Sequence, residues 1–142
     1  MTGRRQATAR IRVAFSDVDP MQVVWHGNYF KYFDIAREKL FDEAGVDLYE
    51  MCNDTGMVFP VTRSQAKHIR PLRFRDEIEC TARVLEAEYR IVVEFEIRRV
   101  GDPALCTKGR TEHVAVRLPQ GEMELHIPDA VQRALLGADH GG

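Results

Sequence analysis

A short segment near the start of the chain, residues 17 to 29, holds the residue types most able to do chemistry. Two acids, Asp17 and Asp19, precede a proline, and a short apolar run then leads to His26, Gly27 and Asn28. If a helix begins there, its first N–H groups are unpaired and carry a partial positive charge. Such donors can polarise a carbonyl and hold an oxyanion. A carboxylate in the preceding loop can act as nucleophile or general base on the same carbonyl, so the segment permits acyl-transfer chemistry.

The same residues also have a purely structural interpretation. Asp, Pro, Gly and Asn are the usual turn formers, so both aspartates can be turn residues. His26 and Asn28 can cap a helix, and Trp25 can be a packing residue rather than a substrate wall. Spacing alone does not decide between the two interpretations.

A long amphipathic helix is expected directly after this segment, over residues 28 to 44. Asn28 suits its N-cap, and Gly45 suits a left-handed residue that closes it. At about 1.5 Å per residue this helix is about 25 Å long. Its apolar face recurs at intervals of three and four residues, at Tyr29, Phe33, Ala36 and Leu40.

Alternating patterns predict strands in most of the remaining chain. A first strand is expected over residues 9 to 15, with Ile11, Val13 and Phe15 on one face. After a loop at 53 to 56, further strands are expected at 58–69, 76–88, 91–100 and 105–118, followed by a short helix at 128–136. One helix covers only one face of such a sheet. We therefore expect an α+β domain with an antiparallel sheet that forms an oligomer.

The composition limits the classes of function. The 142 residues point to a single domain over 1–142, with a frayed tail at about 137–142. Twenty Lys and Arg against 22 Asp and Glu give a net charge of -2, which argues against nucleic acid or an anionic membrane as a partner. No apolar run approaches the roughly 18 residues of a membrane span, and the basic first residues lack the apolar run of a secretory signal. We expect a cytoplasmic protein.

Metal and disulfide chemistry are not expected. The three cysteines, Cys52, Cys80 and Cys106, are far apart and lack the spacing of a disulfide framework or a zinc site. The five histidines are equally scattered. The sequence therefore predicts no metal site and no redox cofactor.

The segment DVDPMQVVWHGNYFKYFDIAREKLF resembles the signature of the hotdog-fold acyl-CoA thioesterases, in the 4-hydroxybenzoyl-CoA thioesterase group and its YbgC-like relatives. A second stretch, residues 69–73 with Asp76 and Glu77, is also similar, and the order of elements agrees along nearly the whole chain. The resemblance implies an antiparallel sheet wrapped around one long central helix. It also implies edge-to-edge pairing into a homodimer at least, and into a homotetramer if dimers associate again. The residues in register with the signature are Asp17, Asp19, Val24, His26, Asn28, Tyr29, Tyr32, Phe33, Asp34, Ala36 and Arg37.

The resemblance implies hydrolysis of an acyl-CoA thioester to a carboxylic acid and CoA. The family's catalytic aspartate falls on Asp19, which would attack the thioester carbonyl or activate a water. The carbonyl-polarising N–H falls at or next to His26, so the helix would start slightly earlier than capping suggests, and the His26 side chain would assist. The implied substrate-binding residues are Val24, Trp25, Asn28 and Tyr29.

Two more candidates lie farther along the chain. Asp34 matches an acidic helix position that approaches the acyl group from the partner subunit, although an exposed ion pair with Arg37 or Lys31 explains it equally well. The CoA phosphates need basic groups, and Arg90 is the first candidate, with Lys67 or Arg63 on the preceding strand as others.

Substrate choice stays open at this stage. Gln22 and Arg75 stand where the family usually has glycine, and Gln22 would narrow the site or add a hydrogen bond to the acyl group. The acyl group can be aliphatic or aromatic. The alternatives are a thioesterase for acyl carrier protein and a non-catalytic acyl-CoA-binding hotdog protein. A hydratase fits less well, because the distance from Asp19 to His26 is wrong for its motif.

Overall fold

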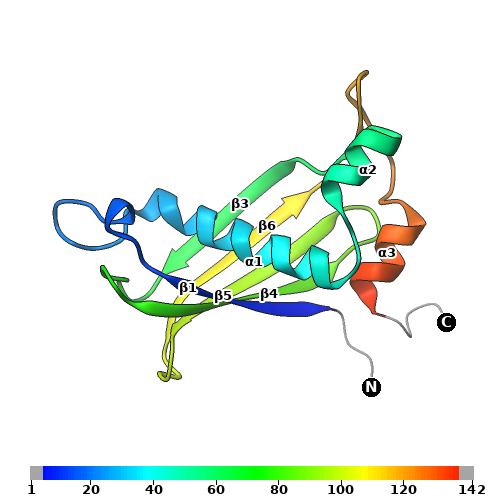
Figure 1. Ribbon diagram of the computed structural model, residues 1–142. Helices are drawn as coiled ribbons and strands as arrows, with labels where there is room; N and C mark the ends of the chain where they lie inside the picture. The colour runs from blue at the N-terminus through cyan, green and yellow to red at the C-terminus, as the bar shows by residue number, and fades with distance from the viewer. Residues whose placement is uncertain (1–4, 138–142) are drawn as a thin grey trace.

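The computed structural model describes residues 5–137, and its main element is a five-stranded antiparallel sheet (Figure 1). The strand order is β1-β4-β5-β6-β3, so β1 and β3 form the two edges. Apart from Gly137, the tail expected at 137–142 lies outside the described residues. The strands are β1 (Gln6–Arg12), β3 (Val61–His68), β4 (Glu77–Glu86), β5 (Ile91–Arg99) and β6 (Leu105–His113).

One long helix, α1 (Tyr29–Glu43), lies across one face of this sheet (Figure 1). At the centre of the contact the Phe33 ring stacks on Phe95, with 4.5 Å between centroids, and lies directly over the backbone of Gly109. The helix ends before Gly45, whose φ of 81° is the expected left-handed conformation. The predicted α+β architecture, an antiparallel sheet curved around one helix, is confirmed.

The far end of the core is closed by two short helices and a small second sheet. The sheet joins β2 (Met57–Val58), β7 (Val116–Arg117) and β8 (Glu122–Met123), and α3 (Asp129–Leu136) follows as predicted. The helix α2 (Leu48–Thr55) extends into the region expected to be a loop. It begins at Asp47, whose side chain accepts a hydrogen bond from the Glu50 N–H, and it ends at Gly56. None of its eight residues is fully buried, although Met51 packs partly against the core, and two turns are too short for a helical stripe to stand out in the sequence.

The first strand lies earlier than expected. β1 ends at Arg12, and the chain leaves the sheet in a short 3₁₀ helix, η1 (Phe15–Asp17). Phe15 therefore does not continue the inward face with Val13 but is 75% exposed. The cause is local, because the Asp17 carboxylate accepts a hydrogen bond from the Ala14 N–H and curls the chain there.

Among residues 5–137, no helix is long and apolar enough to cross a membrane. Within the same residues, no three His, Cys, Asp or Glu side chains are grouped as metal ligands. All three cysteines are free.

Candidate active site

The loop between β1 and α1 is held to the core by its own backbone. The Val24 N–H donates to the Leu72 carbonyl at 2.8 Å, and the Trp25 N–H donates to the Asp17 carbonyl at 3.0 Å. The Asn28 side chain donates to the same Asp17 carbonyl at 2.9 Å. Asn28 precedes α1 as predicted, but its side chain ties the loop together instead of capping the helix.

Asp17 is the buried acid of this loop, with only 3% of its surface exposed. Its carboxylate accepts hydrogen bonds from the Lys31 ammonium, from the Tyr32 hydroxyl at 2.8 Å and from the Ala14 N–H at 3.2 Å. Burial would raise the pKa of Asp17, but these hydrogen bonds outweigh it and hold that pKa below its ordinary value. Asp17 therefore serves the loop structure as a carboxylate.

Asp19 has different surroundings. Its Oδ1 accepts a hydrogen bond from the Met21 N–H at 2.9 Å, and its carbonyl accepts one from Gln22 at 2.8 Å, which closes a tight turn. Within residues 5–137 the other carboxylate oxygen has no hydrogen-bond partner. The turn thus fixes the direction of the Asp19 carboxylate and leaves one of its oxygens able to react.

Asp19 lines a pocket of about 320 Å³ at the start of α1. The wall has three parts: the loop after β1, the first turn of α1 and the end of β3 with the residues that follow it. Four residues singled out in the sequence, Asp19, Val24, His26 and Tyr29, are brought together here. The complete lining is Asp19, Val23, Val24, His26, Tyr29, His68, Ile69, Arg70 and Pro71.

Backbone donors lie at the start of the helical segment, where His26 lines the same pocket as Asp19. A 3₁₀ turn, η2 (His26–Asn28), precedes α1, so the helical segment starts at His26 as the family resemblance implies. Among the described residues no backbone acceptor is found for the N–H groups of His26 and Gly27, as is usual at a helix start. The Trp25 ring packs on Gly27 so closely that a Cβ there would lie 2.1 Å from the ring. Trp25 is 53% exposed and covers this turn, but it is not among the pocket-lining residues.

His68 is the site residue that the sequence reasoning missed. Its imidazole centroid lies 4.4 Å from that of the Tyr29 ring, at the pocket wall. Partial burial, with a contribution from nearby His26, lowers the pKa of His68, which keeps the imidazole neutral at pH 7. Its register partner on β6 is Thr107, whose hydroxyl is buried and has no hydrogen-bond partner in the described part of the chain. A sign was present in the sequence, since His68 directly precedes the second stretch similar to the family.

Asp34 and Arg90 do not reach this pocket within one chain. The Asp34 carboxylate pairs with Arg37 at 2.9 Å on the exposed side of α1. Arg90, at the turn between β4 and β5, pairs with Glu112 at 2.6 Å. Because Ile91 pairs with His113 and His68 pairs with Thr107, the turn lies six positions along β6 from the pocket, about 20 Å away.

Comparisons with known proteins identify the family of this chain. A family model described as the Thioesterase-like superfamily matches residues 13–135. A protein of Thermosynechococcus vestitus named 1,4-dihydroxy-2-naphthoyl-CoA hydrolase is 25% identical over 127 residues, covering 89% of this chain and 86% of the relative.

Two solved structures share the fold. The crystal structure of a 1,4-dihydroxy-2-naphthoyl-CoA thioesterase from Synechocystis has a TM-score of 0.85 at 19% identity, covering 96% of this chain and 98% of the other. A mutant of 4-hydroxybenzoyl CoA thioesterase complexed with 4-hydroxybenzoyl CoA has a TM-score of 0.84 at 20% identity, covering 92% and 99%. The hotdog fold expected from the sequence is therefore confirmed.

Proposed function

Because this chain belongs to the thioesterase-like superfamily, we propose that it hydrolyses an acyl-CoA thioester to a carboxylic acid and CoA. One observation carries the proposal: Asp19 lines the same pocket as His26, at the helix start where the N–H groups of His26 and Gly27 have no backbone acceptor among the described residues. The relative from Thermosynechococcus vestitus, named as a CoA thioester hydrolase, supports the same activity.

In the proposed reaction the thioester carbonyl oxygen accepts hydrogen bonds from N–H groups at His26 and Gly27. These donors stabilise the negative charge that develops on the oxygen. The free Asp19 oxygen either attacks the carbonyl carbon or takes a proton from the attacking water. The C–S bond then breaks and its electron pair leaves with the sulfur as a thiolate. Where Asp19 itself has attacked, a water then hydrolyses the anhydride between the acyl group and Asp19, which releases the carboxylic acid and restores the carboxylate. Since a thiolate leaves readily, His26 is needed only to assist proton transfer.

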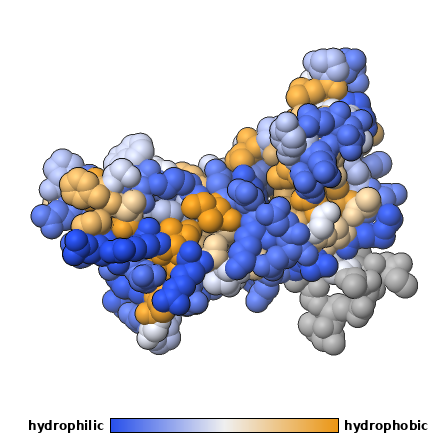
Figure 2. Space-filling view, in the orientation of Figure 1, coloured by the Kyte–Doolittle hydropathy of each residue, from blue (hydrophilic) through white to orange (hydrophobic). Residues whose placement is uncertain are grey.

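Two of the pocket walls suit a flat acyl group. Tyr29 and His68 present neighbouring rings, and Val24 lies beside them. Further apolar side chains are exposed in the loop between β1 and α1, at Phe15, Met21 and Trp25. Figure 2 shows hydrophobic surface at the end of the molecule where this loop lies. We propose an aromatic acyl group as the preferred substrate and an aliphatic one as the alternative.

We also propose that two chains pair along β3. This strand forms one edge of the sheet, and its outer backbone groups have no partner in the described chain. Nearly all its side chains are exposed, and it carries no proline or bulge at its centre to prevent pairing. Pairing there would continue the sheet into a second copy and extend the pocket wall at His68. A mass measurement by light scattering tests this, because a monomer would contradict it and a tetramer would mean that dimers associate again.

Release of free thiol from a panel of acyl-CoAs, from short aliphatic to benzoyl and phenylacetyl, tests the activity. Asp19→Asn is compared with Asp102→Asn, a matched change in the turn between β5 and β6. The Asp102 carboxylate accepts a hydrogen bond from the N–H two residues ahead at 2.9 Å, as the Asp19 carboxylate does. We expect Asp19→Asn to lose at least two orders of magnitude in kcat, or about 2.7 kcal/mol, and Asp102→Asn to keep its activity. Full activity in Asp19→Asn would make Asp19 a turn residue only. No turnover from folded wild type would favour a carrier-protein substrate or a binding protein.

A further inference from the structure

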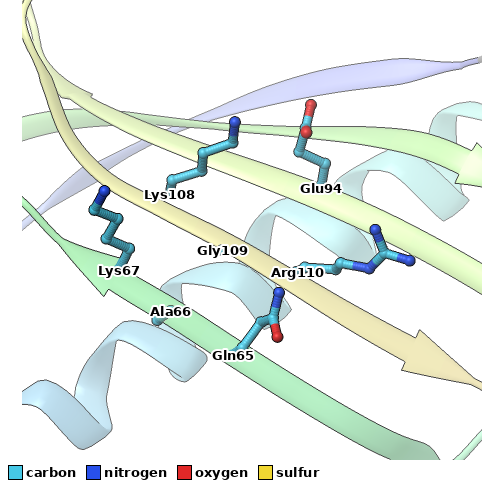
Figure 3. A pocket seen from close by; sticks show the side chains of 7 residues that line it. All are labelled: Gln65, Ala66, Lys67, Glu94, Lys108, Gly109 and Arg110. Carbon is cyan, nitrogen blue, oxygen red and sulfur yellow. The ribbon is translucent and has the colours of Figure 1, made fainter.

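A second hollow, of about 530 Å³, lies on the face of the sheet that α1 does not cover. Figure 3 shows its side chains rising from β3, β5 and β6 with the helix behind the strands. The lining has three cations and one carboxylate. The residues are Gln65, Ala66, Lys67, Glu94, Lys108, Gly109 and Arg110.

Two lysines face each other across the strands in this hollow. Lys67 on β3 is the direct register partner of Lys108 on β6. Like charges directly opposite on a sheet repel and reduce stability. Within residues 5–137 neither ammonium group has an ion-pair or hydrogen-bond partner. The arrangement therefore costs stability in the free protein and leaves two positive charges uncompensated.

The nearby carboxylates do not neutralise these lysines, because each is paired with an arginine. Glu94, on the wall of the hollow, is held by Arg83. Glu96, the register partner of Lys108 on β5, pairs with Arg98 at 2.9 Å.

The next carboxylate along β6 is also paired. Glu112 lies 2.6 Å from one guanidinium nitrogen of Arg90, and Arg110 lies 3.4 Å from its other oxygen. The arginines on this face thus hold the carboxylates, and the two lysines remain available to an anion.

We propose that this hollow is a binding site for a phosphate-bearing anion, held by Lys67 and Lys108 with Arg110 at its side. Ammonium and guanidinium groups form strong charge-assisted hydrogen bonds with phosphate oxygens. The two lysines rise from register-paired positions on neighbouring strands, and Gln65 adds an amide donor to the wall. An anion bound between the two ammonium groups would offset the repulsion that they exert on each other.

The phosphates of a CoA ester are one source of this anion, and in that form the inference rests on the proposed function. Lys67 and the pocket residue His68 are consecutive on β3, so the two sites lie on opposite faces of one strand end. If two chains pair along the β3 edge, they do so through backbone groups, so the side chains on the face that α1 does not cover remain accessible to an anion. A free phosphate or an unrelated nucleotide is the other source, and binding measurements distinguish the two.

The experiment measures binding by calorimetry, without turnover, for CoA, dephospho-CoA, pantetheine and inorganic pyrophosphate. The proteins are wild type, the double variant Lys67→Ala with Lys108→Ala, and the charge-preserving double variant Lys67→Arg with Lys108→Arg. Lys39→Ala is the matched control, because it removes one cation from α1, beside β1 at the other edge of the sheet. Thermal melting of each protein is followed with and without pyrophosphate.

We expect wild type, the arginine variant and Lys39→Ala to bind CoA alike, and the alanine variant to bind it at least tenfold more weakly. Without ligand, the alanine variant should melt at the same temperature as wild type or higher, because the repulsion is gone. Pyrophosphate should raise the melting temperature of wild type, of the arginine variant and of Lys39→Ala, but not that of the alanine variant. Lysines that served stability alone would give a lower melting temperature in the alanine variant and unchanged CoA binding, which would overturn the inference.

The source of the anion follows from the same data. Weaker binding of CoA but not of pantetheine assigns the site to the phosphates of the substrate, and the KM for acyl-CoA should then rise in the alanine variant while kcat stays unchanged. Binding of pyrophosphate without binding of CoA supports the anion site and assigns it to another phosphate. A protein that binds CoA through these lysines but hydrolyses no thioester would contradict the proposed function and leave this inference standing. Equal binding of every anion by wild type and the alanine variant would overturn it.

Discussion

Asp17 and Asp19 are two residues apart, yet one carboxylate is enclosed by donors and the other faces the pocket. Asp17 is buried and accepts hydrogen bonds from Lys31, Tyr32 and Ala14. Asp19 uses one oxygen to close its own turn and leaves the other unpaired among the described residues. The two acids of the motif therefore have different surroundings: Asp17 holds the loop, and Asp19 is the acid that we propose to react.

Asp17→Asn should destabilise the protein, whereas Asp19→Asn should not. Loss of a charged acceptor with three donors costs about 1–3 kcal/mol. Because the folded-state pKa of Asp17 is lowered, its contribution is complete above the ordinary value of 3.8 and is lost as pH falls through the lower folded pKa. Urea unfolding at pH 7 and pH 3 measures both effects, and equal stability of the two variants at pH 7 would refute the division of roles.

The pKa of His68 should depend on His26. Burial lowers the pKa of His68, and the charge on His26 lowers it further. In His26→Gln the second effect disappears, so the pKa of His68 should rise toward its ordinary value. Titration of the imidazole signals by NMR follows this, with His126→Gln as the comparison. An unchanged pKa would mean that the two rings do not interact.

His113 should make the stability depend on pH. It is fully enclosed: its Nδ1–H donates to the Phe59 carbonyl, and its Nε2 accepts from the Thr111 hydroxyl. Burial, with a contribution from the Arg37 guanidinium, lowers the pKa of His113 to about 4.

The direction of this pH dependence follows from comparing proton uptake by His113 in the folded and unfolded states. The unfolded chain, with an ordinary pKa of 6.5 at this histidine, takes up the proton first as the pH falls. The stabilising effect of the neutral imidazole is therefore complete above pH 6.5 and is lost between about 6.5 and 4. Its size is on the order of 3 kcal/mol. Free energies of unfolding at pH 7 and pH 5 should differ in wild type and differ much less in His113→Gln, and parallel pH curves for the two proteins would count against this assignment.

Much of the fold was predictable because its patterns are local. The face of α1, the alternation along β4 and β5 and the left-handed Gly45 each depend on side chains a few positions apart. The helix α2 was missed because it is only eight residues long and none of its residues is fully buried. The end of β1 was placed too late because a side-chain hydrogen bond from Asp17 overrides the alternation at Phe15.

The candidate site was predictable only in its first part. Asp19, His26 and Tyr29 come from one continuous segment, so a motif can identify them. His68 joins them because β3 returns beside α1, and Lys67 meets Lys108 because β3 pairs with β6. Such neighbours depend on the register of distant strands, which a single sequence does not specify.

Gly109→Ala should be strongly destabilising. A Cβ at this position would lie 2.3 Å from the Phe33 ring, which is itself stacked on Phe95 and has no free space to move into. Overpacking of this kind costs about 1–3 kcal/mol. The double variant Gly109→Ala with Phe33→Leu should lose less than the sum of the two single changes, because the smaller side chain makes room for the methyl group. Strict additivity in urea unfolding would show that the two residues are not in contact.

Gln22→Gly and Arg75→Gly should stabilise the protein, since both residues have the left-handed conformation that favours glycine, with φ of 67° and 72°. The family usually has glycine at these two positions, so Gln22 and Arg75 adopt a left-handed backbone conformation that their side chains disfavour. The left-handed conformation costs a residue other than glycine about 1–2 kcal/mol of stability. A glycine avoids this cost but loses more backbone entropy on folding, which reduces the gain by about 0.5–1 kcal/mol. We expect a net gain of about 0.5–1 kcal/mol at Gln22, and less at Arg75, whose guanidinium also lies 4.9 Å from the Phe74 ring centroid.

Gln22→Ala is the control that separates the effect of the side chain from that of the backbone, because alanine removes the amide but keeps the cost of the left-handed conformation. The Gln22 side chain lines a separate hollow with Phe15 and Phe74 rather than the Asp19 pocket, so thioester hydrolysis should be unchanged in all three variants. If urea unfolding showed Gln22→Gly to be less stable than Gln22→Ala, the turn that holds Asp19 would carry no backbone strain.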